Sequence, residues 1–232
     1  MRPAPVIAAA LGALALGGIA AWWLLVPDAE QPPPFPEARG PAMQVTGLCA
    51  RMPDPATTTA EMTAQGWQPL TEEQALAFGR ADTLARIIAW SADQGFDGPA
   101  EMARLDEFAG MVQADLARPD RAGWHQVFAG ADGSFAHFMR DPRLPGALLC
   151  NVYLAQPSDI DDFLSWLRGW TVESTRSEWM IQEDVALRRE PPGFEIGTGV
   201  KITDPALAAA ALGQVPGIVA RATTSWRAEP AG

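Results

Sequence analysis

The sequence predicts an α+β domain, in which N-terminal helices pack on a mainly antiparallel sheet of about five strands, preceded by a single transmembrane or signal helix. Three observations predict this fold class. An uncharged apolar run extends from Val6 to Val26, apolar residues then recur with a helical period up to Pro119, and the period shortens towards two residues after Gly123. Helices followed by strands in separate runs are typical of α+β domains.

The N-terminal run is long enough to cross a membrane. Its 21 residues would form a helix of about 30 Å, which matches the hydrocarbon core of a bilayer. Signal peptides have shorter apolar regions of about 7 to 15 residues, so the length favours a retained signal anchor over a signal peptide. Ten of the residues are Ala or Gly, which weakens insertion, and secretion after cleavage is the alternative.

Charges around the run set its orientation. Arg2 precedes it and Asp28 and Glu30 follow it, so we expect the N-terminus in the cytoplasm and the rest of the chain outside the inner membrane, in the periplasm. Six prolines in residues 27–41 exclude a helix or a central strand. Residues 1–26 are therefore expected to be the anchor or signal peptide, residues 27–44 an extended linker, and residues 45–232 an exported globular domain.

The charge of the chain limits its partners. The formal net charge is −11 at pH 7 and the pI is about 4.6, so binding to a phosphate backbone lacks its electrostatic driving force, and nucleic acid is excluded as a partner. Nine Trp and nine Phe residues supply enough apolar surface for a core. We expect the partner to be an envelope protein or a small ligand.

The two cysteines, Cys49 and Cys150, are separated by 101 residues. This spacing does not fit a CxxC redox motif or zinc motif. In an oxidising compartment, an even pair of cysteines predicts a disulfide. Two free buried thiols are the alternative.

The helical part contains two long segments. A short helix is expected first, from Thr57 or Thr58 to Gln65. Thr71 and Gln74 form a capping-box pattern, which predicts a helix from Glu72 to about Ala92 with a weak point at Gly79. An apolar stripe is expected along it, at Ala77, Ala81, Leu84 and Ile88. Pro99 then begins a second long helix that continues to about Arg118.

The second half of the chain alternates as strands do. Strands are predicted at residues 124–129, 134–140, 147–155, 178–189 and 218–227, with a helix capped by Ser158 between the third and fourth. Between the last two strands, the sequence from Pro191 to Gly217 is rich in proline and glycine. It predicts a long connection with a short helix at residues 205–212, serving either as a functional lid or as a mobile loop.

The chain has two histidines, His125 and His137, on the first predicted hairpin. Pairing Trp124 with Met139 matches apolar residues and requires an even loop, which places the histidines on opposite faces. An odd loop at residues 131–133 with a bulge would place them on one face. No third residue has metal-ligand spacing from either histidine, so neither a metal nor a cofactor is predicted.

Glu183 interrupts the apolar face of its strand, and a carboxylate there requires a partner or marks a site. We expect it to pair with Arg221 on the last strand, and Glu183, His137 and Arg221 are the candidate binding residues. No catalytic signature is found, so the chain is interpreted as a membrane-tethered binding module. The alternative is a small-molecule hydrolase or other enzyme that uses dispersed residues such as Glu183, His137 and Asp184.

The geometry of the folded chain separates a binding module from an enzyme. A cleft lined by at least two of the dispersed residues with shifted pKa values would favour the enzyme. A flat apolar patch near Trp170 or Trp179 would favour a protein-binding surface.

Overall fold

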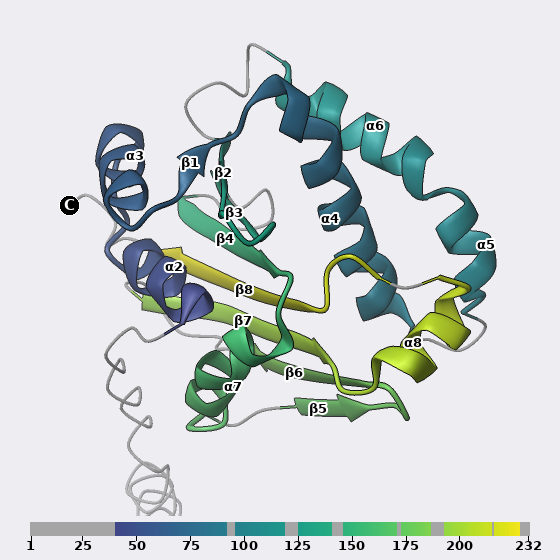
Figure 1. Ribbon diagram of the computed structural model, residues 1–232. Coiled ribbons are helices and arrows are strands. Elements are labelled where there is room, and N and C mark those ends of the chain that lie inside the picture. Colours follow the sequence, from purple (N-terminus) through teal and green to yellow (C-terminus); the bar gives the residue numbers. More distant parts are fainter. Residues whose placement is uncertain are drawn as a thin grey trace, which may run out of the picture. The chain divides into compact units, whose positions relative to one another are not determined.

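A computed structural model (Figure 1) describes residues 40–91, 96–118, 125–140, 146–170, 173–186, 193–214 and 216–227. The predicted anchor at residues 6–26 and most of the predicted linker lie outside these ranges. No helix within them is both long enough and apolar enough to span a membrane. The first described helix, α2, spans Pro41–Ala50 and therefore begins inside the stretch that the sequence assigned to the linker.

The described strands form one antiparallel sheet, which confirms the α+β class. Eight strands take part, more than the five expected, in the order β1-β2-β3-β4-β8-β7-β6-β5. Their bounds, in the order of the sheet, are β1 Gln68–Pro69, β2 His125–Ala129, β3 Phe135–Arg140, β4 Ala147–Leu154, β8 Ala220–Arg227, β7 Gly193–Ile202, β6 Met180–Ala186 and β5 Glu173–Arg176. The last strand of the chain, β8, thus lies in the middle of the sheet, between β4 and β7.

The prediction of a lid or loop between Pro191 and Gly217 is wrong for its first half. This segment supplies β7, which pairs with β6 and β8 along its length. Its glycines suggested a loop, but Gly199 has a packing role: an added Cβ would lie 2.4 Å from Cδ2 of Leu164. Glycine therefore lets α7 (Asp161–Leu167) approach the sheet closely. The predicted short helix is present as α8, Pro205–Leu212.

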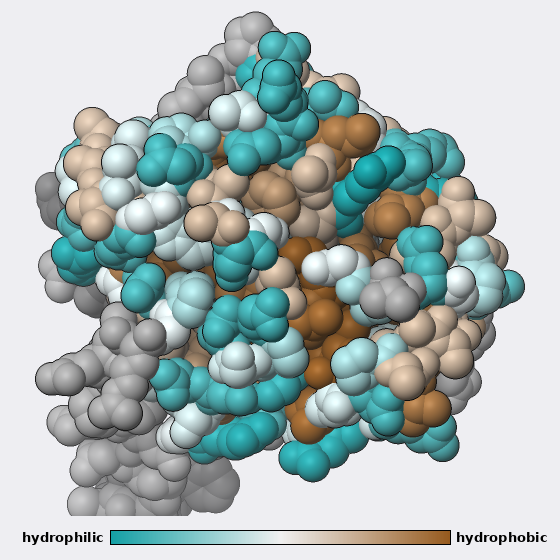
Figure 2. All heavy atoms as spheres, viewed as in Figure 1, coloured by the Kyte–Doolittle hydropathy of each residue, from teal (hydrophilic) through white to brown (hydrophobic). Residues whose placement is uncertain are grey.

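Helices cover both faces of the sheet (Figure 1). One face packs against α2, α3 (Pro55–Ala64) and α7, the last preceded by a 3-10 turn at Pro157–Ile160. The other face packs against α4 (Glu72–Trp90), α8 and the helices α5 (Gly98–Ala103) and α6 (Leu105–Leu116). In the same view, Figure 2 shows hydrophilic residues spread over the surface and a band of hydrophobic residues near the centre. Among large apolar residues in the described ranges, those that are exposed are Trp90, Met111 and Leu207.

The predicted capping box is confirmed at the start of α4, where Thr71 and Gln74 satisfy each other's backbone groups. The second long helix, in contrast, is divided at Arg104 into α5 and α6. The break lets the two halves contact different partners. An added Cβ on Gly98 would lie 2.1 Å from the carbonyl oxygen of Ala211 in α8, whereas α6 lies along α4.

Helix α4 also departs from its predicted stripe, because Ala77 is exposed while Phe78 and Gly79 are buried. The helix is covered on two sides, by the sheet and by α6, so one apolar stripe does not describe it. Gly79 lies at the α6 contact, where an added Cβ would be 2.4 Å from the carbonyl oxygen of Ala109. Gly79, which the sequence predicted to be a weak point of the helix, is therefore a position where α4 and α6 pack closely.

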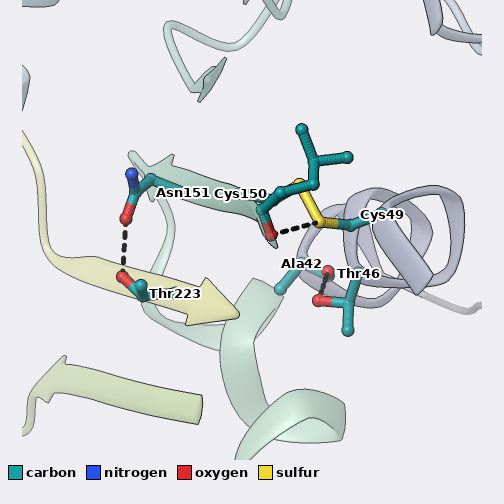
Figure 3. Close-up of a disulfide and its surroundings, with 7 residues drawn as sticks. Ala42, Thr46, Cys49, Cys150, Asn151 and Thr223 are labelled. Carbon is teal, nitrogen blue, oxygen red and sulfur yellow. Dashed lines mark hydrogen bonds between the residues drawn. A yellow bond between two sulfur atoms is a disulfide. The ribbon is translucent and has the colours of Figure 1, made fainter. Parts of the chain in front are cut away.

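The predicted disulfide is present and joins α2 to the middle of the sheet. Cys49 and Cys150 have Cα atoms 6.3 Å apart and both are buried. Figure 3 shows that Cys150, in β4, points towards α2, whereas its neighbour Asn151 forms its hydrogen bond with Thr223 of β8 on the other side of the sheet. Adjacent residues of β4 therefore serve opposite faces.

Replacement of both cysteines by serine is expected to lower the free energy of unfolding by about 2 to 5 kcal/mol, because the bridge closes a long loop in the unfolded chain. Denaturant titration of the wild type and the double variant measures the loss. Reductant should destabilise the wild type by a similar amount and leave the variant unchanged. An equal midpoint for oxidised and reduced wild type would contradict the expectation.

Gly79→Ala is expected to destabilise the domain by about 1 to 3 kcal/mol, because the new methyl group meets backbone rather than a movable side chain. Gly110→Ala is the matched control. It also lies in a helix of this pair, α6, but an added Cβ there has nothing within 4 Å, so helix propensity alone should stabilise it by up to about 1 kcal/mol. Thermal and denaturant unfolding of both variants tests the contrast in sign.

Candidate functional site

A row of polar side chains crosses the sheet face that α4 covers. Strand register places them side by side on consecutive strands, from β3 through β4, β8 and β7 to β6. In that order they are His137, Asn151, Thr223, Thr198 and Asp184. Two hydrogen bonds connect the row: Thr223 Oγ1 donates to Asn151 Oδ1 at 2.7 Å, and Thr198 Oγ1 donates to Asp184 Oδ1 at 2.7 Å.

Helix α4 places two charged residues above this row. Tyr153 Oη donates to Asp82 Oδ1 at 2.5 Å, and Arg86 Nη2 lies 2.7 Å from Asp82 Oδ2. Asp82 is 5% exposed, so its carboxylate is a buried charge with a partner at each oxygen. Burial is the main cause that raises the pKa of Tyr153 well above its ordinary value, with the charge of Asp82 second. Tyr153 is therefore a neutral donor at physiological pH.

Between the sheet and α4 lies a cavity of about 300 Å³. A row that is apolar except for Ser225 borders the polar row on one side, and Tyr153 and Arg221 border it on the other. The residues that line it come from α4, β3, β4, β7 and β8, and they are Asp82, Arg86, His137, Met139, Leu149, Asn151, Tyr153, Ile196, Thr198, Arg221 and Thr223. We call this space the α4 cavity.

Arg221 is the least satisfied charge in the α4 cavity. Its Nε has no accessible surface and no hydrogen-bond partner, and the guanidinium forms no ion pair with any residue in the described part of the chain. Burial is the main cause that lowers the pKa of Arg221 from its ordinary value, and the nearby Tyr153 and Asp82 act in the opposite direction. Arginine starts from so high a pKa that it stays charged. A half-buried cation without a hydrogen-bonded counter-ion marks a candidate binding site.

The two histidines lie on one face, which corrects the prediction that they lie on opposite faces. His125 pairs with Met139 across the hairpin, and Val127 pairs with His137. The turn is closed by a bond from Gly130 N to Ser134 O, and Gly133 adopts a φ of 88°, so the odd loop forms. His137 Nε2 and His125 Nδ1 are 3.2 Å apart.

Glu183 lies on the opposite face of the sheet from Arg221, so the predicted pair does not form. Its Oε1 accepts a hydrogen bond from Arg168 Nε at 2.8 Å. Arg168 is the C-cap residue of α7, directly after Leu167. The prediction failed because it assumed that β6 and β8 are neighbours, whereas β7 lies between them. Glu183 is thus outside the α4 cavity, although it is 1% exposed.

Of the three predicted binding residues, the fold brings His137 and Arg221 together in the α4 cavity. Sequence reasoning missed the rest of the lining. Asn151 gave a signal, because it is the one strongly polar residue in the apolar run of β4. Asp82 gave none, since its burial results from the way α4 lies between the sheet and α6.

The chemistry of the α4 cavity favours binding over proton transfer. Burial, followed by His125 and Arg86, lowers the pKa of His137 to about 3. A histidine with this pKa is neutral at pH 7 and a weak general base. In the described ranges, no three His, Cys, Asp or Glu residues are arranged to hold a metal ion.

The pKa of His137 implies a pH-dependent stability. The unfolded value is about 6.5 and the folded value about 3, so between these values only the unfolded chain binds the proton. Stability should therefore fall as the pH drops through this window, by up to about 1.4 kcal/mol per pH unit. His137→Gln should reduce that slope, as measured by urea titrations from pH 8 to pH 4. Equal slopes in both proteins, after normalisation at pH 8, would contradict the assignment.

Comparison with known proteins was made for the whole chain. No protein-family model, no curated protein and no solved structure matches it. The function must therefore be inferred from the α4 cavity, its polar row and the charge of Arg221.

Proposed function

We propose that this chain is an exported domain that binds a small organic molecule in the α4 cavity. The observation that carries the proposal is Arg221, a half-buried cation that lines the cavity, has a buried Nε without a partner, and has no hydrogen bond to the described part of the chain. A ligand that supplies an acceptor would satisfy it. The volume of about 300 Å³ is at the lower end of the range for small-molecule sites.

Burial of the other polar groups supports the same function. His137 is 6% exposed, and Asn151 and Thr223 are each 9% exposed. The Nδ1 atom of His137 also has no hydrogen-bond partner within the described residues. Unsatisfied buried polar groups are uncommon in folded proteins, and a bound ligand is one way in which their hydrogen bonds are completed.

The enzyme hypothesis has less support. It required a cleft lined by at least two of Glu183, His137 and Asp184 with shifted pKa values, and only His137 lines the α4 cavity. The alternative of a flat apolar patch near Trp170 or Trp179 is not favoured either, because their exposed fractions are 6% and 8%. A concave polar site therefore favours a ligand-binding module over both a hydrolase and a protein-docking surface.

Export is part of the proposal. The disulfide between Cys49 and Cys150 supports an oxidising compartment, because such bridges rarely persist in the cytosol. With the apolar run from Val6 to Val26, it favours a periplasmic domain tethered to the inner membrane by that run, and secretion after cleavage stays the alternative. An envelope protein as a partner is a further proposal, on which the α4 cavity does not depend.

A thermal-shift screen of the purified full-length chain tests ligand binding. The probes are small organic acids, amides, alcohols and amines of about 6 to 15 non-hydrogen atoms, a size suited to the cavity. At least one class is expected to raise the unfolding temperature in a dose-dependent way, since a ligand that binds the folded state stabilises it.

Two variants show whether the α4 cavity is responsible. Leu149→Trp should fill the cavity and abolish the shift, whereas Leu207→Trp, at an exposed position on α8, is the matched control and should retain it. Thr223→Val keeps the side-chain volume, removes one hydroxyl of the polar row and should weaken binding if Leu149→Trp fails to fold. The proposal is wrong if no class shifts the wild type, or if the shift persists unchanged in the cavity variants.

A further inference from the structure

The α4 cavity has a charge opposite to that of the whole chain. Its lining contains Arg86, Arg221 and Asp82, so that with His137 and Tyr153 neutral the lining residues carry one net positive charge. Asp184, which accepts a hydrogen bond from the lining residue Thr198, lies outside the lining. The whole chain carries a formal charge of −11. A single positive charge inside an acidic domain favours a ligand with a single negative charge.

Of the two cations that line the α4 cavity, Arg221 is the one available to a negatively charged ligand, because Arg86 forms an ion pair with Asp82. Both oxygens of Asp82 already have partners, in Tyr153 and Arg86. The oxygens of Asp184 accept from Thr198 and from Gln182 Nε2, the latter at 2.7 Å. Among the described residues, Arg221 forms no hydrogen bond with either carboxylate, although both charges act on its guanidinium.

The shape of the guanidinium selects the kind of anion. Arginine presents parallel N–H groups that match the two oxygens of a planar carboxylate. Phosphate sites usually add several backbone N–H groups from a helix N-terminus or a glycine-rich loop. The α4 cavity instead has the face of a sheet as its floor, where the strands already use their N–H groups in pairing. A carboxylate therefore fits this site better than a phosphate.

The other side of the α4 cavity is apolar. Met139, Leu149 and Ile196 line it on the side away from Arg221, in a row across the sheet that also includes the buried Ser225 between Leu149 and Ile196. On β4, Leu149 is four residues from Tyr153, the cross-strand partner of Arg221, which corresponds to about 13 Å along a strand. A ligand that reaches from Arg221 to this row needs an extended apolar part.

From these observations we propose that the ligand is a monocarboxylate with a short apolar chain. The carboxylate pairs with Arg221, and the Nδ2 amide of Asn151 donates a hydrogen bond beside it, because the hydroxyl proton of Thr223 is already donated to Asn151 Oδ1. The apolar chain lies over Met139, Leu149 and Ile196. This assignment rests on the proposed function, because it names the class of molecule that the α4 cavity binds.

Calorimetric titration of the full-length chain with matched compounds tests the assignment. The probes are straight-chain acids of four to ten carbons, the primary amides of the same lengths, and inorganic phosphate. Acids are expected to bind at least about tenfold more tightly than their amides, as for the loss of a charged hydrogen bond. Each added methylene should improve binding about threefold to fourfold until the cavity is filled.

Variants assign the selectivity to one residue. Arg221→Met should reduce the affinity for acids to that for amides and leave amide binding in place. Arg104→Met is the matched control, because it removes the same charge from an exposed position between α5 and α6, outside the cavity lining, and it should change nothing. Should Arg221→Met fail to fold, Arg221→Lys keeps the charge without the planar pair of donors, and a loss of at least threefold is expected.

The outcomes separate this assignment from the proposed function. Amides that bind as tightly as acids, or acids that bind equally to wild type and Arg221→Met, overturn the assignment and leave a ligand-binding domain. Phosphate that binds as tightly as the longest acid also overturns it. If neither acids, amides nor any compound of the wider screen binds, the proposed function fails as well.

Discussion

Strand β4 carries the constraint on which the rest of the structure depends. All eight of its residues are buried, because it has strands on both sides and helices on both faces. Successive side chains of a strand point to opposite faces, so each residue of β4 belongs either to the α2 side or to the α4 side. Cys150 links the strand to α2 through its disulfide bond with Cys49. Asn151, one residue later, lies in the floor of the α4 cavity. A shift of one residue in register would exchange the two roles.

The floor of the α4 cavity therefore rests on a packed layer. Behind it are the disulfide and the apolar cluster that contains Leu148, Val152 and Ala222. Such a backing holds side chains such as Asn151, Thr223 and Arg221 in fixed positions, so a ligand meets groups that need little reorganisation. The same rigidity explains how the buried Nε of Arg221 is tolerated without a partner: the stability of the surrounding sheet offsets the cost of the missing hydrogen bond.

Local sequence patterns predicted many of the elements, and tertiary contacts decided the exceptions. Helix α4 begins where Thr71 and Gln74 predict, and Cys49 and Cys150 form the expected bridge. Strand β7 was not predicted, because its glycines suggested a loop. Gly199 is instead required by the close packing of Leu164 in α7, a contact between residues far apart in the chain. Strands β1 and β5 have two and four residues, too few for a period of two to be recognised.

The sequence by itself determined the α+β class and the disulfide, because composition, spacing and local period are properties of neighbouring residues, and it also singled out two residues that line the α4 cavity, His137 and Arg221. Only the tertiary structure decided which residues share the α4 cavity. It placed β7 between β6 and β8. Glu183 therefore forms its ion pair with Arg168, and Arg221 has no ion pair with a carboxylate among the described residues. It also set the odd hairpin loop that puts His125 beside His137. Strand order and register join residues that are far apart in the chain, and no local pattern encodes them.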